Sequence, residues 1–470
     1  MRKTMFMAWF ALGLSACGGA TIAEEGEDPE VVLLGAELGN DLVMAGEPSE
    51  VVTRLRVETA VLEGAARPPI NLALVIDTSG SMDGDPIADA RAASLDLLST
   101  LHPEDRLAVI AFHSETEVLL ESTQLEGADL GELRSRIGRM EARGTTDLAG
   151  GLRAGLEEVV RHFEPDGINR LVLLSDGVPN DATQVLPLSQ AAGERGIRIT
   201  ALGLGVDFDE TLLAHVAQQS GGRFHYVEES SMVAGVFRDE VLRFERLLAR
   251  NLRLELRPGP GVRIDGVVGQ QITPMANGHV EVALGDLSEG EHRDVIVRMQ
   301  AGPRRAGAAV ELLDAVLHFD DAVQNAGRLE RRAYLGARAT SDSAEVDAHR
   351  NAEVERAAAR MLAAATTVQA IEVAREGDII AARQALAQAE AQARAAAEAR
   401  ADVELRAQAD QMRVLRGALP SMAADAPAAA AEEAYYEEDA PAAGMAAPAP
   451  EPASVIRSAH GEAMRVLQSE

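Results

Sequence analysis

Cysteine, lysine and aromatic residues are all scarce in this 470-residue chain. The single cysteine, Cys17, excludes disulfides within the chain, zinc sites rich in cysteine, and iron–sulfur clusters. The only lysine, Lys3, lies in a leader that we expect to be removed, which excludes a lysine-based active site from the mature chain. Positive charge is also short, since 44 Lys+Arg against 75 Asp+Glu give a formal net charge of −31. Because phosphate recognition needs a basic surface, this balance argues against nucleic-acid binding.

The N-terminus has the pattern of a secretion signal. A basic start is followed by the apolar run 5–14, which is too short to span a bilayer as a stable helix. The run ends in Leu14-Ser15-Ala16-Cys17, a string that resembles the lipobox of bacterial lipoproteins. The resemblance implies cleavage before Cys17, lipidation of its thiol, and anchoring in a bacterial cell envelope, at the outer membrane or on the periplasmic face. An ordinary signal peptide with an incidental cysteine is the alternative.

Between residue 71 and about residue 248, apolar runs alternate with amphipathic segments of helical periodicity. The run 71–76 is continuously apolar, as is typical of strands buried on both faces of a parallel sheet. This alternation predicts a doubly wound α/β domain with a mostly parallel sheet. The other predicted strands are 107–112, 171–174, 197–204 and 223–227, and the predicted helices are 87–101, 130–140, 148–162, 185–195, 210–219 and 233–248.

The segments on either side of this domain have a different pattern. Residues 51–59 and 252–257 alternate apolar with charged side chains, which predicts half-buried strands. Further β-like runs at 280–284, 295–299 and 316–319 are separated by Gly, Pro and Asn, which predicts a small antiparallel sheet or sandwich. Since the strand at 51–59 shares their two-faced pattern, we expect the α/β domain to be inserted into a small β-sandwich.

The C-terminal part is expected to be helical and then disordered. Residues 346–416 are rich in alanine, and Glu376-Gly377-Asp378 should end one arm of a helical hairpin and cap the next. The segment 421–452 is rich in Ala, Pro and acidic residues, so it cannot bury a core. Apolar residues at helical spacing beyond 455 indicate either a docking helix or a frayed end. The predicted boundaries are a signal peptide at 1–16, an acidic tether at 17–46, a sandwich strand at 47–70, the α/β domain at 71–249, the sandwich at 250–342, the helical hairpin at 343–418, the disordered linker at 419–453 and a short C-terminal helix at 454–470.

Three segments with oxygen-bearing side chains lie at the ends of predicted strands or before a helix. The first is Asp77-Thr78-Ser79-Gly80-Ser81, the second is GTTD at 144–147, and the third is SDG at 175–177. Open α/β sheets bind their ligands at the carboxyl ends of the strands, where the first and third segments lie. Carboxylates and hydroxyls without His or Cys suit Mg²⁺ or Mn²⁺ rather than zinc.

These segments resemble the metal-ion-dependent adhesion site of the von Willebrand factor A domain, which has the pattern D-x-S-x-S, then a Thr, then an Asp. Asp77, Ser79 and Ser81 match the first element, Thr146 matches the Thr, and Asp176 matches the last Asp. The resemblance covers about residues 71–248 and implies a Rossmann-like α/β fold. The family usually has two glycines before the Thr, whereas residues 144 and 145 are Gly and Thr, a departure that would stiffen the loop.

The resemblance implies that these five residues hold Mg²⁺, or else Mn²⁺ or Ca²⁺, and that an open position takes an Asp or Glu carboxylate of a partner protein. The flanking strands are similar to those of bacterial A-domain lipoproteins and of the inter-alpha-inhibitor heavy-chain group. We therefore expect a membrane-anchored protein that binds a protein ligand. The alternative is a structural subunit of an envelope complex, in which the metal loop only stabilises the fold.

Catalysis and nucleotide binding are not expected. A hydrolase could use Ser79 or Ser81 with His113 or His225 as base, but no G-x-S-x-G motif is present and these histidines lie at predicted strand ends. The string Gly203-Leu204-Gly205 lacks the further Gly or Lys of a phosphate-binding loop. We predict that the protein is not an enzyme.

Overall fold

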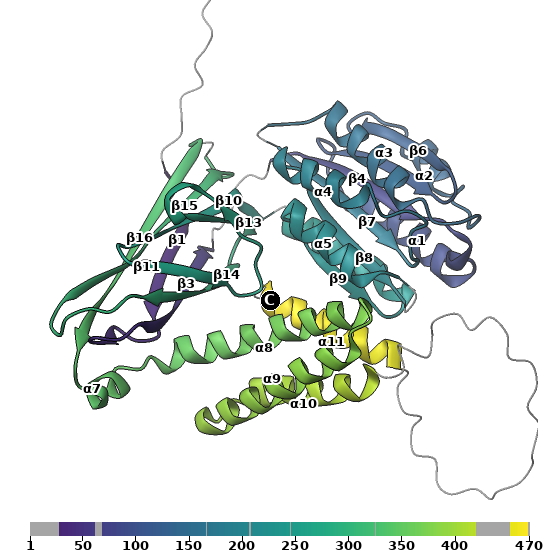
Figure 1. The fold of residues 1–470 in the computed structure, drawn as a ribbon. Coiled ribbons are helices and arrows are strands. Elements are labelled where there is room, and N and C mark those ends of the chain that lie inside the picture. Colours follow the sequence, from purple (N-terminus) through teal and green to yellow (C-terminus); the bar gives the residue numbers. More distant parts are fainter. Residues whose placement is uncertain are drawn as a thin grey trace, which may run out of the picture.

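The computed structural model describes residues 28–61, 68–165, 167–205, 208–244, 246–324, 326–419 and 452–468. In these ranges the chain forms an α/β domain, a sandwich of two β-sheets and a group of helices (Figure 1). The expected signal peptide, the lipidation site Cys17 and nearly all of the linker predicted at 419–453 lie outside the described residues.

The α/β domain is built on a six-stranded sheet with the order β6-β5-β4-β7-β8-β9. All neighbouring strands are parallel except the edge strand β6, which runs antiparallel to β5. Every residue of β4 and β7 is buried, as the continuous apolar runs predict. The strands are β4 (Ile70–Asp77), β5 (Arg106–Phe112), β6 (Thr116–Gln124), β7 (Ile168–Ser175), β8 (Arg198–Leu204) and β9 (Phe224–Val227).

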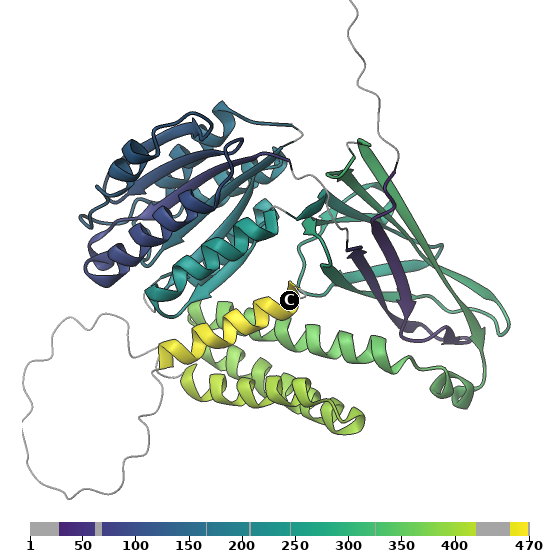
Figure 2. The same ribbon diagram turned by 180° about the vertical axis from the view of Figure 1, so that it is seen from behind.

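Helices cover both faces of this sheet, as Figures 1 and 2 show from opposite sides. On one face lie α1 (Asp85–Thr100), α2 (Leu130–Ile137) and α6 (Val233–Phe244). On the other lie α3 (Leu148–Arg161), α4 (Val185–Glu194) and α5 (Glu210–Ser220). The predicted doubly wound α/β fold is confirmed. The helix predicted at 233–248 is wrong beyond Phe244: Leu247 and Leu248 continue the helical apolar pattern but begin a buried strand of the sandwich.

The sandwich consists of two sheets with the orders β1-β3-β14-β11 and β12-β13-β10-β15-β16-β2. Strand β3 pairs with β14, for example Leu55 with Val295, so strands from both sides of the α/β domain share one sheet. The predicted insertion is therefore confirmed. The strands are β1 (Val32–Leu38), β2 (Leu42–Met44), β3 (Ser49–Thr59), β10 (Leu247–Pro258), β11 (Val262–Val267), β12 (Thr273–Pro274), β13 (Val280–Ser288), β14 (His292–Ala301), β15 (Ala309–Asp321) and β16 (Arg328–Thr340).

The acidic tether predicted at 17–46 is wrong over residues 32–44, which form β1 and β2. Strand β1 pairs along its whole length with β3, from Val32 opposite Thr59 to Leu38 opposite Thr53. Its short sequence VLLGAEL alternates only weakly and includes a glycine, so its pattern does not distinguish it from an extended linker. The partner strand β3 supplies the pairing that makes it part of the sheet.

The C-terminal helices are α7 (Ser343–Ala348), α8 (Ala352–Arg375), α9 (Ile379–Arg400), α10 (Val403–Ala418) and α11 (Pro452–Leu467). The predicted break at 376–378 is present, and the Asp378 carboxylate accepts a hydrogen bond from the Ala381 N–H (2.9 Å). The prediction of a single hairpin is wrong because a second break separates α9 from α10. There Ala401 is left-handed (φ 52°), and Asp402 both caps α10 and pairs with Arg360.

Helix α11 docks rather than frays, which decides between the two alternatives. It packs against α8, α10 and strand β9 (Figures 1 and 2). It buries Ile456, Ala459 and Leu467. His460 also points inward and is 0% exposed, with its ring 5.7 Å from that of Phe224. Neither ring nitrogen of His460 has a hydrogen-bond partner among the described residues.

This buried histidine should make stability depend on pH. Burial, reinforced by Arg375, lowers the pKa of His460 to about 4, below the ordinary value near 6.5. Between these values the unfolded chain binds a proton that the native chain does not. The contribution of the neutral His460 to the free energy of unfolding should therefore be fully present above about pH 6.5, and about 3 kcal/mol of it should be lost as the pH drops toward 4.

Urea unfolding of the wild type, His460→Leu and the exposed-site control His102→Leu at pH 7.0, 5.5 and 4.5 measures this effect. The difference between the wild type and His460→Leu in the free energy of unfolding, plotted against pH, should isolate the stability lost through His460. His102→Leu should depend on pH as the wild type does. Parallel pH profiles for all three proteins would contradict the assignment.

Candidate metal site

The site forms where two central strands of the α/β sheet end side by side. Strand β4 ends in Asp77 and its parallel neighbour β7 ends in Ser175, with Asp176 directly after it. The chain winds outward from β4 in both directions along the sheet, so these carboxyl ends lie at its topological switch point. Because the strands are wholly buried, the polar residues at their ends are fixed in position by the sheet.

The structure brings all five predicted site residues together. The Ser79 and Ser81 hydroxyl oxygens lie 2.9 Å apart, and the Ser81 hydroxyl donates to Asp176 Oδ1 (2.8 Å). The Ser79 N–H donates to Asp77 Oδ1 (2.9 Å). A Cβ placed on Gly177 would lie 3.1 Å from the Thr146 hydroxyl and 3.8 Å from the Ser81 hydroxyl, so both hydroxyls face this glycine.

Electrostatics at Asp77 favour a bound cation. This carboxylate is 0% exposed, and it accepts hydrogen bonds from the neutral Ser175 hydroxyl (2.7 Å) and Ser79 N–H. Burial raises the pKa of Asp77 and outweighs these hydrogen bonds, which lower it. A divalent cation would supply the missing positive charge.

The donor set fits a hard cation. Two carboxylates and three hydroxyls are the oxygen ligands that Mg²⁺, Mn²⁺ and Ca²⁺ prefer. Within the described ranges no three or more His, Cys, Asp and Glu side chains are grouped so that they could hold a metal.

The loop 143–147 closes one side of the site. Gly144 accepts a hydrogen bond from the Gly80 N–H (3.0 Å) through its carbonyl, and it has φ +73°. A Cβ at Gly144 would lie 2.4 Å from the Ser114 hydroxyl, so glycine is required. The predicted stiffening by Thr145 has a structural basis, because its hydroxyl accepts from the Asn180 side chain (2.8 Å) and its N–H donates to Ser114 (3.0 Å).

The sequence pattern singled out the segment 175–177 but gave Ser175 no role of its own, and it did not indicate Ser114 or Asn180. Ser175 immediately precedes Asp176 at the end of a buried strand, so its position in the sequence could have indicated a role. Ser114 and Asn180 carry no such signal because their loops meet only in the fold.

The structure gives the two histidines other contacts. The His113 ring accepts a hydrogen bond from Arg143 (2.9 Å), and the His225 ring lies 3.2 Å from the Glu240 carboxylate. Among the described residues no hydrogen bond joins either ring to Ser79 or Ser81. The arrangement does not provide a nucleophile activated by an adjacent base.

Residues 71–239 match the family described as the von Willebrand factor type A domain. The uncharacterized protein sll0103 of Synechocystis is 31% identical over 267 residues, covering 54% of this chain and 63% of that protein. The uncharacterized protein YfbK of Escherichia coli is 24% identical over 249 residues, covering 51% of this chain and 43% of that protein. Inter-alpha-trypsin inhibitor heavy chain H1 of Sus scrofa is 31% identical over 169 residues, covering 34% of this chain and 19% of that protein. The matched region thus spans less than two thirds of each of these relatives.

Solved structures share the fold over a longer region. A von Willebrand factor type A protein from Catenulispora acidiphila has a TM-score of 0.66 at 17% identity, covering 84% of this chain and 90% of that one. The ArnB paralog VWA2 from Sulfolobus acidocaldarius has a TM-score of 0.56 at 18% identity, covering 82% and 94%. The shared architecture therefore extends well beyond residues 71–239. Residues 71–239 therefore form a von Willebrand factor type A domain, a family whose members typically bind proteins and commonly hold a divalent metal ion at a metal-ion-dependent adhesion site.

Proposed function

We propose that this protein binds a carboxylate of a partner protein through a divalent cation, Mg²⁺ by preference. Asp77, Ser79, Ser81, Thr146 and Asp176 would hold the cation. The observation that carries the proposal is the convergence of these five oxygen-bearing side chains on one point at the strand ends. The cation supplies positive charge and an exchangeable coordination position.

The exposure of the site residues sets the direction from which a partner can approach. Asp77 and Ser79 are buried at the base, whereas Ser81 and the neighbouring loop residue Thr145 are exposed. A partner carboxylate would therefore arrive on the Ser81 side. With a net charge of −31, the chain would repel an acidic partner in general, and the cation would make one carboxylate acceptable locally.

We propose further that Cys17 is lipidated and holds the protein in a bacterial cell envelope. The lipobox-like string Leu14-Ser15-Ala16-Cys17 supports this. The described part contains no helix with the length and hydropathy needed to cross a membrane. A Cys17→Ser variant should move from the membrane to the soluble fraction on cell fractionation, and continued membrane association would refute lipid anchoring.

The binding proposal is tested by affinity capture from bacterial envelope extracts in Mg²⁺ and in EDTA. In the von Willebrand factor A family the Thr position responds to the bound carboxylate, so Thr146→Ala should lose captured partners while its melting temperature in EDTA stays near that of the wild type. Thr123→Ala, on edge strand β6, is the control and should capture partners normally. If the wild type in EDTA and Thr146→Ala in Mg²⁺ both retain as much partner as the wild type in Mg²⁺, the proposal is wrong and a structural assembly subunit is favoured.

A further inference from the structure

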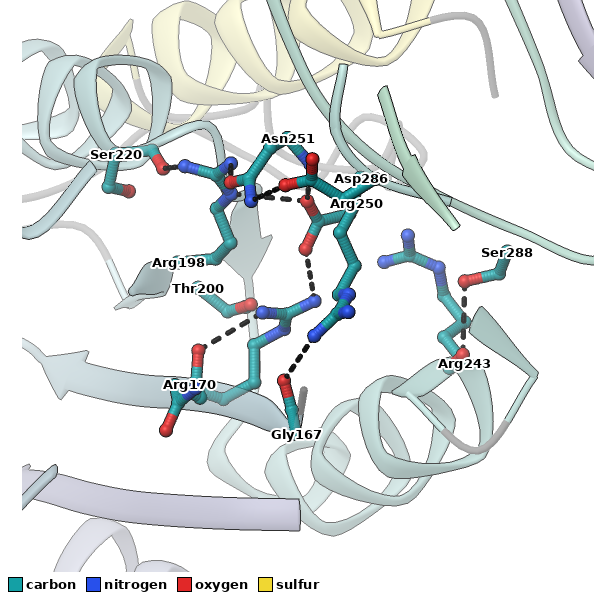
Figure 3. A network of polar contacts seen from close by, with 12 residues as sticks. Gly167, Arg170, Arg198, Thr200, Ser220, Arg243, Arg250, Asn251, Asp286 and Ser288 are labelled. Carbon is teal, nitrogen blue, oxygen red and sulfur yellow. Dashed lines mark hydrogen bonds and ion pairs between the residues drawn. The ribbon is translucent and has the colours of Figure 1, made fainter. Parts of the chain in front are cut away.

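A small cavity of about 30 Å³ lies where the α/β domain meets the sandwich. Five arginine side chains line it, and we call this group the arginine pocket: Arg170, Arg198, Arg223, Arg243 and Arg293. The first four belong to the α/β domain, whereas Arg293 is on sandwich strand β14. Figure 3 shows Arg170 and Arg198 at the carboxylate of Asp286 from strand β13, with Arg243 farther away beside Ser288.

Carboxylates compensate only part of this charge. Asp286 pairs with Arg170 and with Arg198, the latter at 3.3 Å. Glu291 pairs with Arg223 (2.9 Å) and Arg243 (2.7 Å). A third carboxylate, Glu240, pairs with Arg243 at 2.9 Å. Among the described residues, three carboxylates thus pair with four of the five guanidinium groups, and Arg293 is the group that pairs with none of the three.

Arg293 is the member of the pocket with the least compensation. Its side chain donates a weak hydrogen bond to the Gln468 carbonyl (3.5 Å), and its Nε is buried with no hydrogen-bond partner in the described chain. No carboxylate in the described ranges lies within ion-pair distance of Arg293. In the described chain, this guanidinium on the sandwich side of the joint therefore feels the charges of Glu291 and Asp286 only from beyond ion-pair distance.

Burial makes the excess charge costly. Arg170, Arg198 and Arg223 are 4%, 7% and 7% exposed. Burial lowers the pKa of Arg170 and of Arg293, and burial together with the nearby Arg243 and Arg293 lowers the pKa of Arg223 to about 9. Arg293 is partly buried, and a positive charge removed from water without an ion-pair partner is unfavourable, so further negative charge beside it would be stabilising.

We propose that the arginine pocket binds one small monovalent inorganic anion of chloride size, which ties the α/β domain to the sandwich. Guanidinium N–H groups form charge-assisted hydrogen bonds to anions, and here they converge from both domains. A cavity of about 30 Å³ has room for one or two particles of the size of water, which require roughly 10 to 15 Å³ each. Phosphate and sulfate are larger than this space allows.

The test is thermal unfolding of the full chain at constant ionic strength while sodium gluconate is replaced by sodium chloride. The melting temperature of the wild type should rise with chloride and saturate, because the anion binds the native state. Arg293→Met should need about tenfold more chloride for half of the shift, as expected for the loss of one charged donor. Arg263→Met removes the same charge from an exposed sandwich site on β11 and should respond like the wild type.

Two outcomes of this titration would overturn the proposal: no difference between chloride and gluconate, or equal chloride responses in all three proteins. A larger saturating effect of phosphate than of chloride would also overturn it, since the assignment rests on the size of the cavity. If Arg293→Met does not fold, anomalous diffraction from wild-type crystals soaked in bromide decides. A bromide peak among the five arginines supports the proposal, and no peak there overturns it.

Discussion

Asp286→Ala is expected to lower the free energy of unfolding by about 3 to 5 kcal/mol at neutral pH, as breaking a buried ion pair does in other proteins. Burial opposes ionisation of Asp286, yet Arg198 and Arg170 hold its pKa at about 2. The carboxylate also accepts a hydrogen bond from the Asn251 N–H (2.9 Å). Its removal would leave two buried guanidinium groups without their counter-charge.

Urea unfolding of Asp286→Ala, monitored by circular dichroism, measures this effect. The matched control is Asp265→Ala, which breaks a solvent-facing pair with Arg263 and should change stability by less than about 1 kcal/mol. Similar stability losses in the two variants would show that Asp286 does not carry the charge balance of this joint.

Asp77→Ala is expected to abolish stabilisation by the cation. For the wild type, Mg²⁺ at about a hundredfold its dissociation constant should add about 2.7 kcal/mol to the free energy of unfolding, because the ion binds the native state. Asp77 is the more deeply buried of the two carboxylates of the site, at 0% exposed against 8% for Asp176, so without it the increment should vanish. Ser79→Ala and Ser81→Ala should weaken binding less, since water can replace one neutral ligand.

Thermal unfolding in EDTA, Mg²⁺ and Mn²⁺ measures this increment for each variant. Asp181→Ala is the control, because Asp181 is an exposed carboxylate a few residues after Asp176 and caps the Thr183 N–H (2.8 Å). It should keep the wild-type increment. A cation-dependent shift of equal size in Asp77→Ala and the wild type would place the metal elsewhere on this acidic chain.

The metal site could be predicted from sequence because its information is local. Each ligand lies within a few residues of a wholly buried strand or at the start of a helix, and the apolar pattern identifies both elements. Once β4 and β7 are recognised as parallel neighbours, Asp77 and Asp176 must lie at the same edge of the sheet. The α/β fold and the inserted sandwich follow from similarly clear patterns.

The arginine pocket could not be predicted in this way because its contacts are long-range. Arg170 and Asp286 are 116 residues apart and come from different domains, and no motif connects them. The only signal was an arginine next to each of two buried apolar runs, at Arg170 and Arg198. An arginine at such a position is typical of a strand end, so the sequence does not indicate that Arg170 and Arg198 contact Asp286 of the sandwich.

The missed elements have the same physical origin. Strand β1 depends on pairing with β3, and the break after α9 depends on a single left-handed alanine, Ala401, in an otherwise uniform helical sequence. Tertiary contacts decide both cases: the backbone hydrogen bonds of a neighbouring strand in one, and the Asp402–Arg360 ion pair in the other.

Anomalous diffraction from crystals of the wild-type protein grown in Mn²⁺ tests the central claim most directly, because it locates the ion without reference to a partner. The account predicts a strong manganese peak among the hydroxyls of Ser79, Ser81 and Thr146, next to the carboxylates of Asp77 and Asp176. No peak at this position at saturating Mn²⁺, or peaks only on other acidic surfaces, would contradict a cation site at the strand ends and with it the proposed mode of partner binding.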